Sequence, residues 1–203
     1  MYLKNIHLYA FRNYHEQTLN FESQKTILLG NNAQGKSNLL EAVELLATLK
    51  SHRTNRDRDL ILEGEKKGQI LGTVERNYGE SQMGIIFRSP GRRSLMLNHE
   101  NLRRHLEFLG HINAVEFSCL DLELVRGSPE TRRSWLDTLL IQLEPVYASI
   151  INQYNKVLRQ RNALLKVIRK TVEEQTNTDN LSAEMSQLKL WDQQLAEAGT
   201  RVT

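Results

Sequence analysis

The sequence predicts an α/β lobe followed by an all-helical domain, because two kinds of periodicity occupy different parts of the chain. Short alternating or continuous apolar segments fill the first 120 residues, a pattern typical of strands. From residue 128 onward, apolar residues recur at spacings of three and four, which is the helical period. We therefore expect two domains, residues 1–120 and residues 121–203, the second truncated at its C-terminal end.

Most of the first domain reads as strands. Tyr2 to Phe11 alternates apolar and polar residues, and Thr26 to Leu29 is a short apolar run of the kind found in buried strands. Further strand patterns occupy residues 17–21, 69–76, 82–88, 93–97 and 112–117. Turn-forming residues separate the segments from 69 to 97, so successive strands should pair antiparallel. We expect a mixed or antiparallel sheet.

Two helices are expected in this first domain. Ser37 to Leu49 carries apolar residues on one helical face and directly follows a glycine-rich loop. Asn101 to Leu109 fits a short helix.

Three helices are expected in the second domain. Ser128-Pro129-Glu130 combines a cap, a first-turn proline and an acid, the signals of a helix start. This helix and a longer one, from Pro145 to about Val172, are predicted to form a hairpin. A polar loop at 173–180 precedes a third helix at 181–198, and Trp135 and Trp191 are expected to pack within helices.

The composition is that of an ordinary globular protein. The chain has 203 residues, of which 39% are hydrophobic and 25% charged, and a net charge of +3. The N-terminus lacks the sections of a signal peptide, and no apolar run approaches the roughly 18 residues of a membrane span. We expect a cytoplasmic protein with no membrane partner. The single cysteine, Cys119, is expected to be a small buried residue rather than a nucleophile.

The most informative motif is Gly30-Asn31-Asn32-Ala33-Gln34-Gly35-Lys36-Ser37, which matches the phosphate-binding loop G-x-x-x-x-G-K-[ST]. Its glycines let backbone N–H groups converge on an oxyanion. Lys36 supplies charge for the β and γ phosphates, and the Ser37 hydroxyl is a magnesium ligand. The motif follows an apolar segment and opens a helix whose dipole favours anions. The sequence therefore predicts a site for ATP and Mg²⁺.

Residues beyond this loop resemble one group of ATPases. The matching segments are Met1-Tyr2-Leu3-Lys4, Phe11-Arg12-Asn13-Tyr14, Asn32 to Ala42, Ser51-His52-Arg53-Thr54, Leu124 to Pro129 and Tyr154 to Lys166. Together they are similar to the bacterial RecF family, and the similarity covers essentially the whole chain. The resemblance implies a P-loop ATPase head of the ABC type, related to SMC-like proteins. It also implies that Arg12 and Asn13 approach the nucleotide phosphates.

The resemblance implies a role in DNA repair, replication restart and the SOS response. Members of the family are ATP-dependent recombination mediators that bind double-stranded DNA near single-strand junctions and help to load RecA. The implied partners are double-stranded DNA and RecR, with RecO and RecA in the same pathway. An ATP-dependent homodimer of the complete protein is also implied.

The sequence departs from the family in one respect. It has neither a signature motif with a Ser-x-Gly-Gln core nor a Walker B strand ending in paired acids; the nearest apolar runs with acidic ends close at Glu63 and Asp121. ATP hydrolysis needs a group that positions water and a further magnesium ligand. We therefore expect the N-terminal half of a longer protein, weakly active as a DNA-dependent ATPase when complete and nearly inactive as this chain.

Several residues allow two readings. Arg12 is either a phosphate contact or an edge-strand arginine in solvent. Residues 51–54 are either a motif beside the adenine or a polar loop at a helix end. The six histidines show none of the close spacings of a zinc site, so no metal cluster is predicted from them.

A basic stretch in the second domain is the candidate DNA contact, with a solvated helix face as the alternative. Its candidate residues are Lys156, Arg159, Arg161, Lys166 and Arg169. Such cations would make binding to a DNA backbone sensitive to salt. Two rival functions are an SMC-like chromosome-clamping head fragment and a P-loop kinase for a small metabolite, which the antiparallel strand pattern disfavours.

Overall fold

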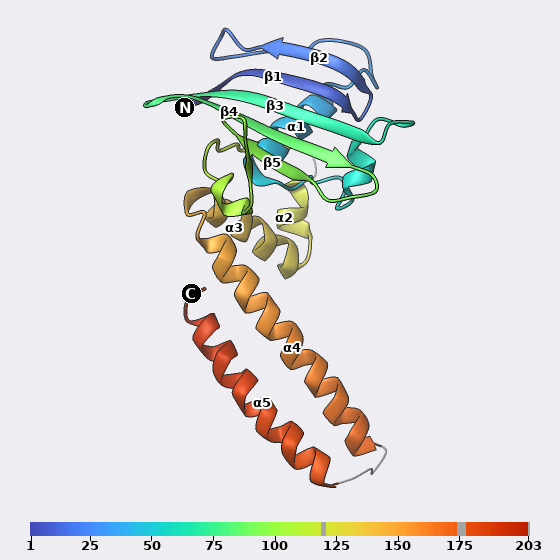
Figure 1. Cartoon of the computed structure of the whole chain (residues 1–203), viewed down its shortest axis with the longest axis vertical. Helices are drawn as coiled ribbons and strands as arrows, with labels where there is room; N and C mark the ends of the chain where they lie inside the picture. The colour runs from blue at the N-terminus through green and yellow to red at the C-terminus, as the bar shows by residue number, and fades with distance from the viewer. Residues whose placement is uncertain (119–120, 174–177, 203) are drawn as a thin grey trace. The chain divides into compact units, whose positions relative to one another are not determined.

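The computed structural model in Figure 1 describes residues 1–118, 121–173 and 178–202. The chain divides into two compact units, Met1–Glu144 and Pro145–Thr203. The division into functional domains at residue 120 stays a prediction. Cys119, expected to be buried, lies outside the described residues.

A six-stranded antiparallel sheet forms one layer of the first unit, in the order β2-β1-β3-β4-β5-β6. The strands are β1 (Tyr2–Phe11), β2 (Tyr14–Asn20), β3 (Lys67–Arg76), β4 (Gly79–Arg88), β5 (Ser94–Leu97) and β6 (Glu100–Leu102). The expected α/β fold with an antiparallel sheet is confirmed, and the predicted strands at 2–11, 69–76, 82–88 and 93–97 agree with it to within a few residues.

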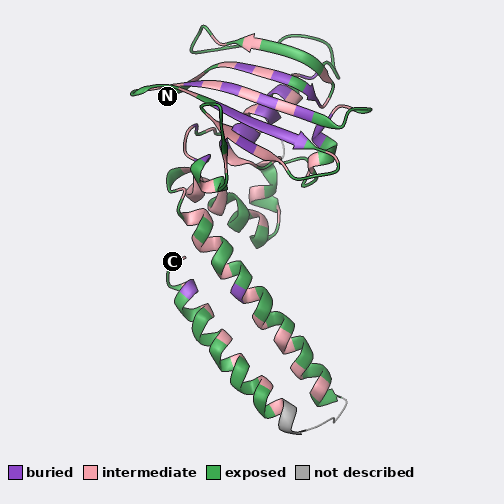
Figure 2. Ribbon diagram, in the orientation of Figure 1, coloured by how far each residue is buried: buried purple, intermediate pink, exposed green. Residues whose placement is uncertain are grey.

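Helix α1 (Lys36–Thr48) packs on one face of this sheet (Figure 1). Alternate residues of β1, β3 and β4 point toward the helix, and Ile6, Ile70 and Ile85 are completely buried there. Figure 2 shows in purple that the central strands carry many buried positions. Gly72 permits the close approach, because a Cβ at this position would lie 2.7 Å from the side chain of Leu46.

Two predicted strands are not strands. Neither residues 26–29 nor residues 112–117 pair with any strand among the described residues. Ile27 and Leu29 are 81% and 88% exposed, and Val115 and Phe117 are 92% and 91% exposed. The apolar pattern is present in the sequence, but no described strand lies alongside to complete the ladder. A strand requires such a partner for its backbone N–H and C=O groups.

The helix predicted at 101–109 is also wrong. Asn98 and His99 both have positive φ values, 49° and 69°, and this conformation forms a tight hairpin turn. The turn brings β6 back onto β5, with Leu102 opposite Leu95. Only a short 3-10 turn, η2 (His105–Glu107), follows; a similar turn, η1 (Asp57–Leu60), precedes β3.

The first unit ends with α2 (Leu122–Arg126) and α3 (Pro129–Leu143). Helix α3 begins as predicted, because the Ser128 hydroxyl accepts a hydrogen bond from the backbone N–H of Thr131. Its apolar residues are not buried: Leu143 is 65% exposed and Trp135 is 50% exposed. The expected packing role of Trp135 is therefore not observed.

The second unit consists of α4 (Tyr147–Glu173) and α5 (Thr178–Gly199), which lie side by side (Figure 1). Their apolar stripes meet along the hairpin, where Val157 is buried and Trp191 is partly buried. The predicted hairpin between α3 and α4 is thus wrong, since the partner of α4 is α5. The helices were placed correctly, but helical periodicity does not specify which neighbour covers a stripe.

Within the ranges that the structure describes, no helix combines the length and the apolar character needed to cross a bilayer.

Candidate functional site

The glycine-rich loop 30–37 adopts a conformation that requires its glycines. Gly30 and Gly35 have φ values of +152° and +100°, in the region that side chains disfavour. A Cβ on Gly35 would lie 2.8 Å from Oδ1 of Asn13, and one on Gly30 would lie 2.7 Å from Oε1 of Gln34. Gly35 is also the N-cap residue directly before α1, so the loop leads straight into the helix N-terminus.

Lys36 and Gln34 both form hydrogen bonds with the backbone of the loop. The Lys36 ammonium donates to the carbonyl oxygens of Gly30 and Asn31, at 2.8 and 2.6 Å. The backbone N–H of Asn31 donates to Oε1 of Gln34 at 3.1 Å. A side-chain oxygen thus accepts from a loop amide, in the way a phosphate oxygen does.

The turn between β1 and β2 fixes this loop from the side. The Tyr14 hydroxyl donates to the carbonyl oxygen of Gly35 at 3.0 Å, and the Asn13 amide donates to that of Ala33 at 3.4 Å. Oδ1 of Asn13 accepts from the Asn38 amide at 2.7 Å. Asn13, predicted as a site residue, therefore does lie against the loop.

Unlike Asn13 and Tyr14, Arg12 forms its side-chain hydrogen bonds outside the glycine-rich loop. Its guanidinium forms a two-point contact with Glu41 of α1, with Nε 2.9 Å from Oε2 and Nη2 2.5 Å from Oε1. Nη1 donates to the backbone oxygen of Asp59 at 2.7 Å. Only 16% of the Arg12 side chain is exposed, so the solvent-facing alternative does not hold. Its contact with a phosphate stays a prediction.

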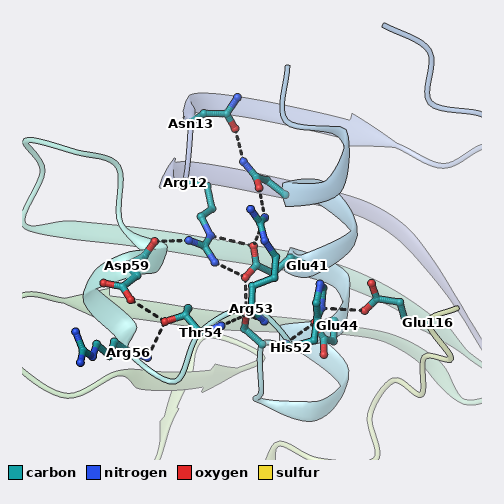
Figure 3. A network of polar contacts seen from close by, with 12 residues as sticks. Arg12, Asn13, Glu41, Glu44, His52, Arg53, Thr54, Arg56, Asp59 and Glu116 are labelled. Atoms are coloured by element: carbon teal, nitrogen blue, oxygen red, sulfur yellow. Dashed lines mark hydrogen bonds and ion pairs between the residues drawn. The ribbon is translucent and has the colours of Figure 1, made fainter. Parts of the chain in front are cut away.

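Glu41 connects Arg12 to the segment that follows α1 (Figure 3). The carboxylate is completely buried and accepts additional hydrogen bonds from the Ser51 hydroxyl, at 2.5 Å, and the Arg53 guanidinium, at 3.2 Å. Burial alone would raise the pKa of Glu41. The hydrogen bonds from Arg12 and Ser51, with the charges of Arg12 and Arg53, outweigh burial and hold this pKa below its ordinary value.

A continuous set of polar contacts therefore joins the glycine-rich loop to residues 51–54 (Figure 3). Nη1 of Arg53 also donates to Oδ1 of Asn38 at 2.5 Å, and the Asn38 amide donates to Asn13. Thr54 closes the far end by donating its hydroxyl proton to Asp59. The 51–54 segment is thus attached to α1, whichever of its two predicted readings applies.

Sequence reasoning missed Glu41 and Asn38 as members of this site, whereas Ser51 lies in the 51–54 segment for which a motif beside the adenine was one of two readings. One signal for Glu41 was available. It lies one helical turn before Leu45, on the side of α1 that faces the core, where an acid needs a cationic partner. The arginines that supply that partner come from distant parts of the sequence, and their positions follow only from the fold.

The candidate DNA contacts lie on α4 and separate into two groups. At about 100° per residue, Lys156, Arg159 and Lys166 share one face, opposite the apolar stripe. Arg161 instead pairs with Asp192 of α5 across the hairpin, and Arg169 pairs with Glu173. Three of the five predicted residues thus form a common exposed face.

The first half of the chain matches a known protein family. The RecF/RecN/SMC N terminal domain family matches residues 2–103, a segment that contains β1, the glycine-rich loop, α1 and the sheet. The chain belongs to this family.

Closely similar family members carry the name DNA replication and repair protein RecF. The protein from Crocosphaera subtropica is 89% identical over 203 residues, and that from Rippkaea orientalis is 73% identical. Each alignment covers 100% of this chain and 53% of the relative. The chain thus spans about half the length of the RecF proteins it matches.

Solved structures of this family share the fold. Two are described as the recombination mediator protein RecF-ATPrS and RecF-ATP in the RecFOR pathway, with TM-scores of 0.86 and 0.85. They are 33% and 34% identical to this chain and cover 99% of it, while the chain covers 52% of each. An Smc head domain from Pyrococcus furiosus has a TM-score of 0.56 at 16% identity, which shows a common fold alone.

Proposed function

We propose that the chain binds ATP with Mg²⁺ at the glycine-rich loop and belongs to a recombination mediator that acts in DNA repair. The observation that carries this proposal is the loop itself: two glycines at positive φ place backbone amides and Lys36 at the N-terminus of α1. A helix N-terminus reached through such a loop favours phosphate groups. The RecF-ATP structure, similar over nearly the whole chain, supports the choice of ATP.

The residues present fit a nucleotide with magnesium. Gln34 Oε1 accepts a hydrogen bond from the backbone N–H of Asn31. When the Gln34 side chain moves away, this N–H can donate to an oxyanion instead. Lys36 is placed to exchange its carbonyl partners for phosphate oxygens. Ser37 is exposed in the first turn of α1 and would hold Mg²⁺, which neutralises phosphate charge. Arg12 and Asn13 would flank the same phosphates.

Calorimetric titration with magnesium-ATP tests this site, with Lys36→Ala as the variant and Lys25→Ala as the matched control. Lys25 is an exposed lysine five residues before the loop. We expect the control to bind as the parent does and Lys36→Ala to lose at least about tenfold in affinity, since two charge-assisted contacts to phosphate disappear. Equal binding by the three proteins would contradict the proposal.

Hydrolysis is proposed to require more than this chain. We propose that the complete protein is a weak DNA-dependent ATPase that dimerises on ATP, and that the chain by itself turns ATP over very slowly. The departures from the family pattern at Walker B and the signature motif support this limit. A turnover rate in the isolated chain equal to that of a complete relative would overturn it.

DNA binding is proposed for the basic face of α4. Lys156, Arg159 and Lys166 project from a long helix on the side opposite the α5 contact. Long cationic side chains on such a face follow a phosphate backbone without reading bases. This favours recognition of double-stranded DNA by backbone or junction shape. Arg161 is assigned to the hairpin instead.

Fluorescence anisotropy with a duplex that carries a single-stranded end tests the α4 face. The double variant Lys156→Ala/Lys166→Ala should bind more weakly, and its plot of log affinity against log salt should be shallower by about two units. Lys189→Ala, an exposed lysine on α5, is the control and should change little. An unchanged salt slope in the double variant would remove α4 from the proposed contact.

The cellular role is proposed from the family alone. We propose action with RecR, RecO and RecA in the cytoplasm, in which ATP-dependent DNA binding aids RecA loading. The names of the relatives, DNA replication and repair protein RecF, support this assignment. Binding of purified RecR to the complete protein on DNA, measured with and without ATP, is the direct test.

A further inference from the structure

A second cluster of polar side chains lies near the contacts of Glu41 and includes another glutamate of α1. Glu44 comes from α1, His52 from the segment after it, and Glu116 from residues 113–118, which are far away in the sequence. Nδ1 of His52 lies 2.7 Å from Oε2 of Glu44 and 3.3 Å from Oε2 of Glu116. Figure 3 shows the imidazole between the two carboxylates.

The spacing of these donor atoms suits a metal ion. One nitrogen and two carboxylate oxygens lie within 4.8 Å of one another. Ligands at about 2.1 Å from zinc are roughly 3.0 to 3.4 Å apart in octahedral or tetrahedral arrangements. The two nitrogen–oxygen distances, 2.7 and 3.3 Å, are close to this range. Small side-chain rotations would therefore place all three donors around one ion, with the metal replacing the proton at Nδ1.

The surroundings also suit an ion. The side chains of Glu44, His52 and Glu116 are 17%, 28% and 30% exposed, so the donors are partly desolvated yet reachable from solvent. They line a depression in the first unit together with Thr48, Ser118 and others. Burial raises the pKa of Glu44, and the nearby charge of Glu116 adds to this, because two carboxylates at short range share a single imidazole.

We propose that Glu44, His52 and Glu116 form a binding site for a divalent transition-metal ion of the zinc class. The imidazole nitrogen selects zinc and its neighbours over magnesium, which prefers an all-oxygen shell. Three protein ligands leave a position for water, as in open zinc sites. The spacing of histidines along the sequence gave no sign of this site, because two of its ligands are glutamates.

The site is separate from the glycine-rich loop but adjacent to its support. His52 lies between Ser51 and Arg53, and both of these neighbours bind Glu41. A metal ion would therefore attach the 51–54 segment to α1 and to residues 113–118 at the same point. The expected consequence is greater stability of the first unit, because a ligand that binds only the folded state stabilises it.

Metal binding can be measured directly on the 203-residue chain after treatment with a chelator. Zn²⁺ is titrated by competition with a chromophoric chelator, and Co²⁺ is added separately so that its visible absorption reports nitrogen and oxygen ligation. We expect one ion per chain and an increase in melting temperature with Zn²⁺. Mg²⁺ at millimolar concentration should not displace the Co²⁺ signal.

Variants locate the ion. His52→Ala and Glu116→Gln should each weaken zinc binding by about 100-fold or more, since loss of even an outer-shell partner costs 10- to 100-fold. His105→Ala, an exposed histidine in η2, is the matched control and should bind as the parent does. Glu116→Gln lies on an exposed segment and keeps the side-chain shape, so it tests the site even if His52→Ala folds poorly. Absence of zinc binding in the parent, or affinity within twofold of the parent in Glu116→Gln, would overturn the proposal.

Discussion

The central strands and the segments 26–29 and 112–117 were all predicted as strands, but several apolar residues of the two segments are exposed to solvent. Ile70 and Phe87 are completely buried between the sheet and α1, whereas Ile27 and Phe117 are 81% and 91% exposed. Both sets read as strands. The difference is that the central strands have strand neighbours on either side among the described residues, while the two exposed segments have none. Apolar character therefore identifies a segment that would be stabilised by burial, and the topology determines whether a neighbouring element buries it.

The largest expected difference between the two environments is in the effect of truncating a phenylalanine. Phe87→Ala removes a buried ring that lies 6.2 Å from the ring of Phe11, and should lower the free energy of unfolding by about 3–5 kcal/mol. Phe117→Ala should change it by less than about 0.5 kcal/mol. Urea unfolding followed by Trp135 fluorescence, in a Trp191→Phe background, measures both. A similar loss in the two variants would mean that Phe117 is packed in solution.

A second test sets a buried charge against an exposed one. Glu41→Gln weakens the contacts with Arg12 and Arg53 and should lower the free energy of unfolding at neutral pH by about 1.5–3 kcal/mol. Glu63→Gln, at an exposed position, should have little effect.

The effect of Glu41 should also depend on pH. Its pKa is lower in the folded chain than its ordinary value of 4.5, so its contribution is complete above that value and is lost as the pH falls through the folded pKa. The difference between the parent and Glu41→Gln should therefore shrink in acid. A difference that is constant from pH 7 to pH 3 would contradict this account.

The smallest stability effect is expected where the apolar surface itself is changed. The double variant Ile27→Ser/Phe117→Ser should keep the parent's stability and bind roughly half as much of a hydrophobic dye, because it removes exposed apolar surface. Gln24→Ser/Asn113→Ser changes polar residues in the same parts of the chain and is the control. Unchanged dye fluorescence in the Ile27/Phe117 variant would show that these segments are covered in solution.

Local patterns predicted the parts of the fold that local interactions determine. The helix start at Ser128, the strands from β3 to β5 and the glycine-rich loop at α1 all follow from nearby residues. The sheet order, the pairing of α4 with α5 and the exposure of residues 26–29 depend on contacts between distant segments. The hairpin at Asn98 and His99 was missed because the residues after it have a helical pattern, whereas the positive φ values of the turn direct them into β6.

The candidate site also contains one part set by neighbouring residues and another set by contacts between distant segments. Its loop is contiguous and was predicted residue by residue. The Glu41 contacts and the Glu44–His52–Glu116 cluster bring together residues from segments that are far apart, and Ser51 and His52 belong to one short segment that serves both. Spacing rules written for single motifs cannot find such groups, although an acid on the core-facing side of α1 is a sign that a partner exists.

The hydrogen bonds from Lys36 to the carbonyl oxygens of Gly30 and Asn31 bear on how the loop would bind an anion. These contacts hold the loop in a closed curve, so under the proposed function a phosphate would meet a binding surface that is already shaped. Association would then be largely an exchange of hydrogen-bond partners at Lys36 and Gln34, with little conformational entropy lost. The apparent affinity would report the difference between two sets of contacts rather than the strength of one.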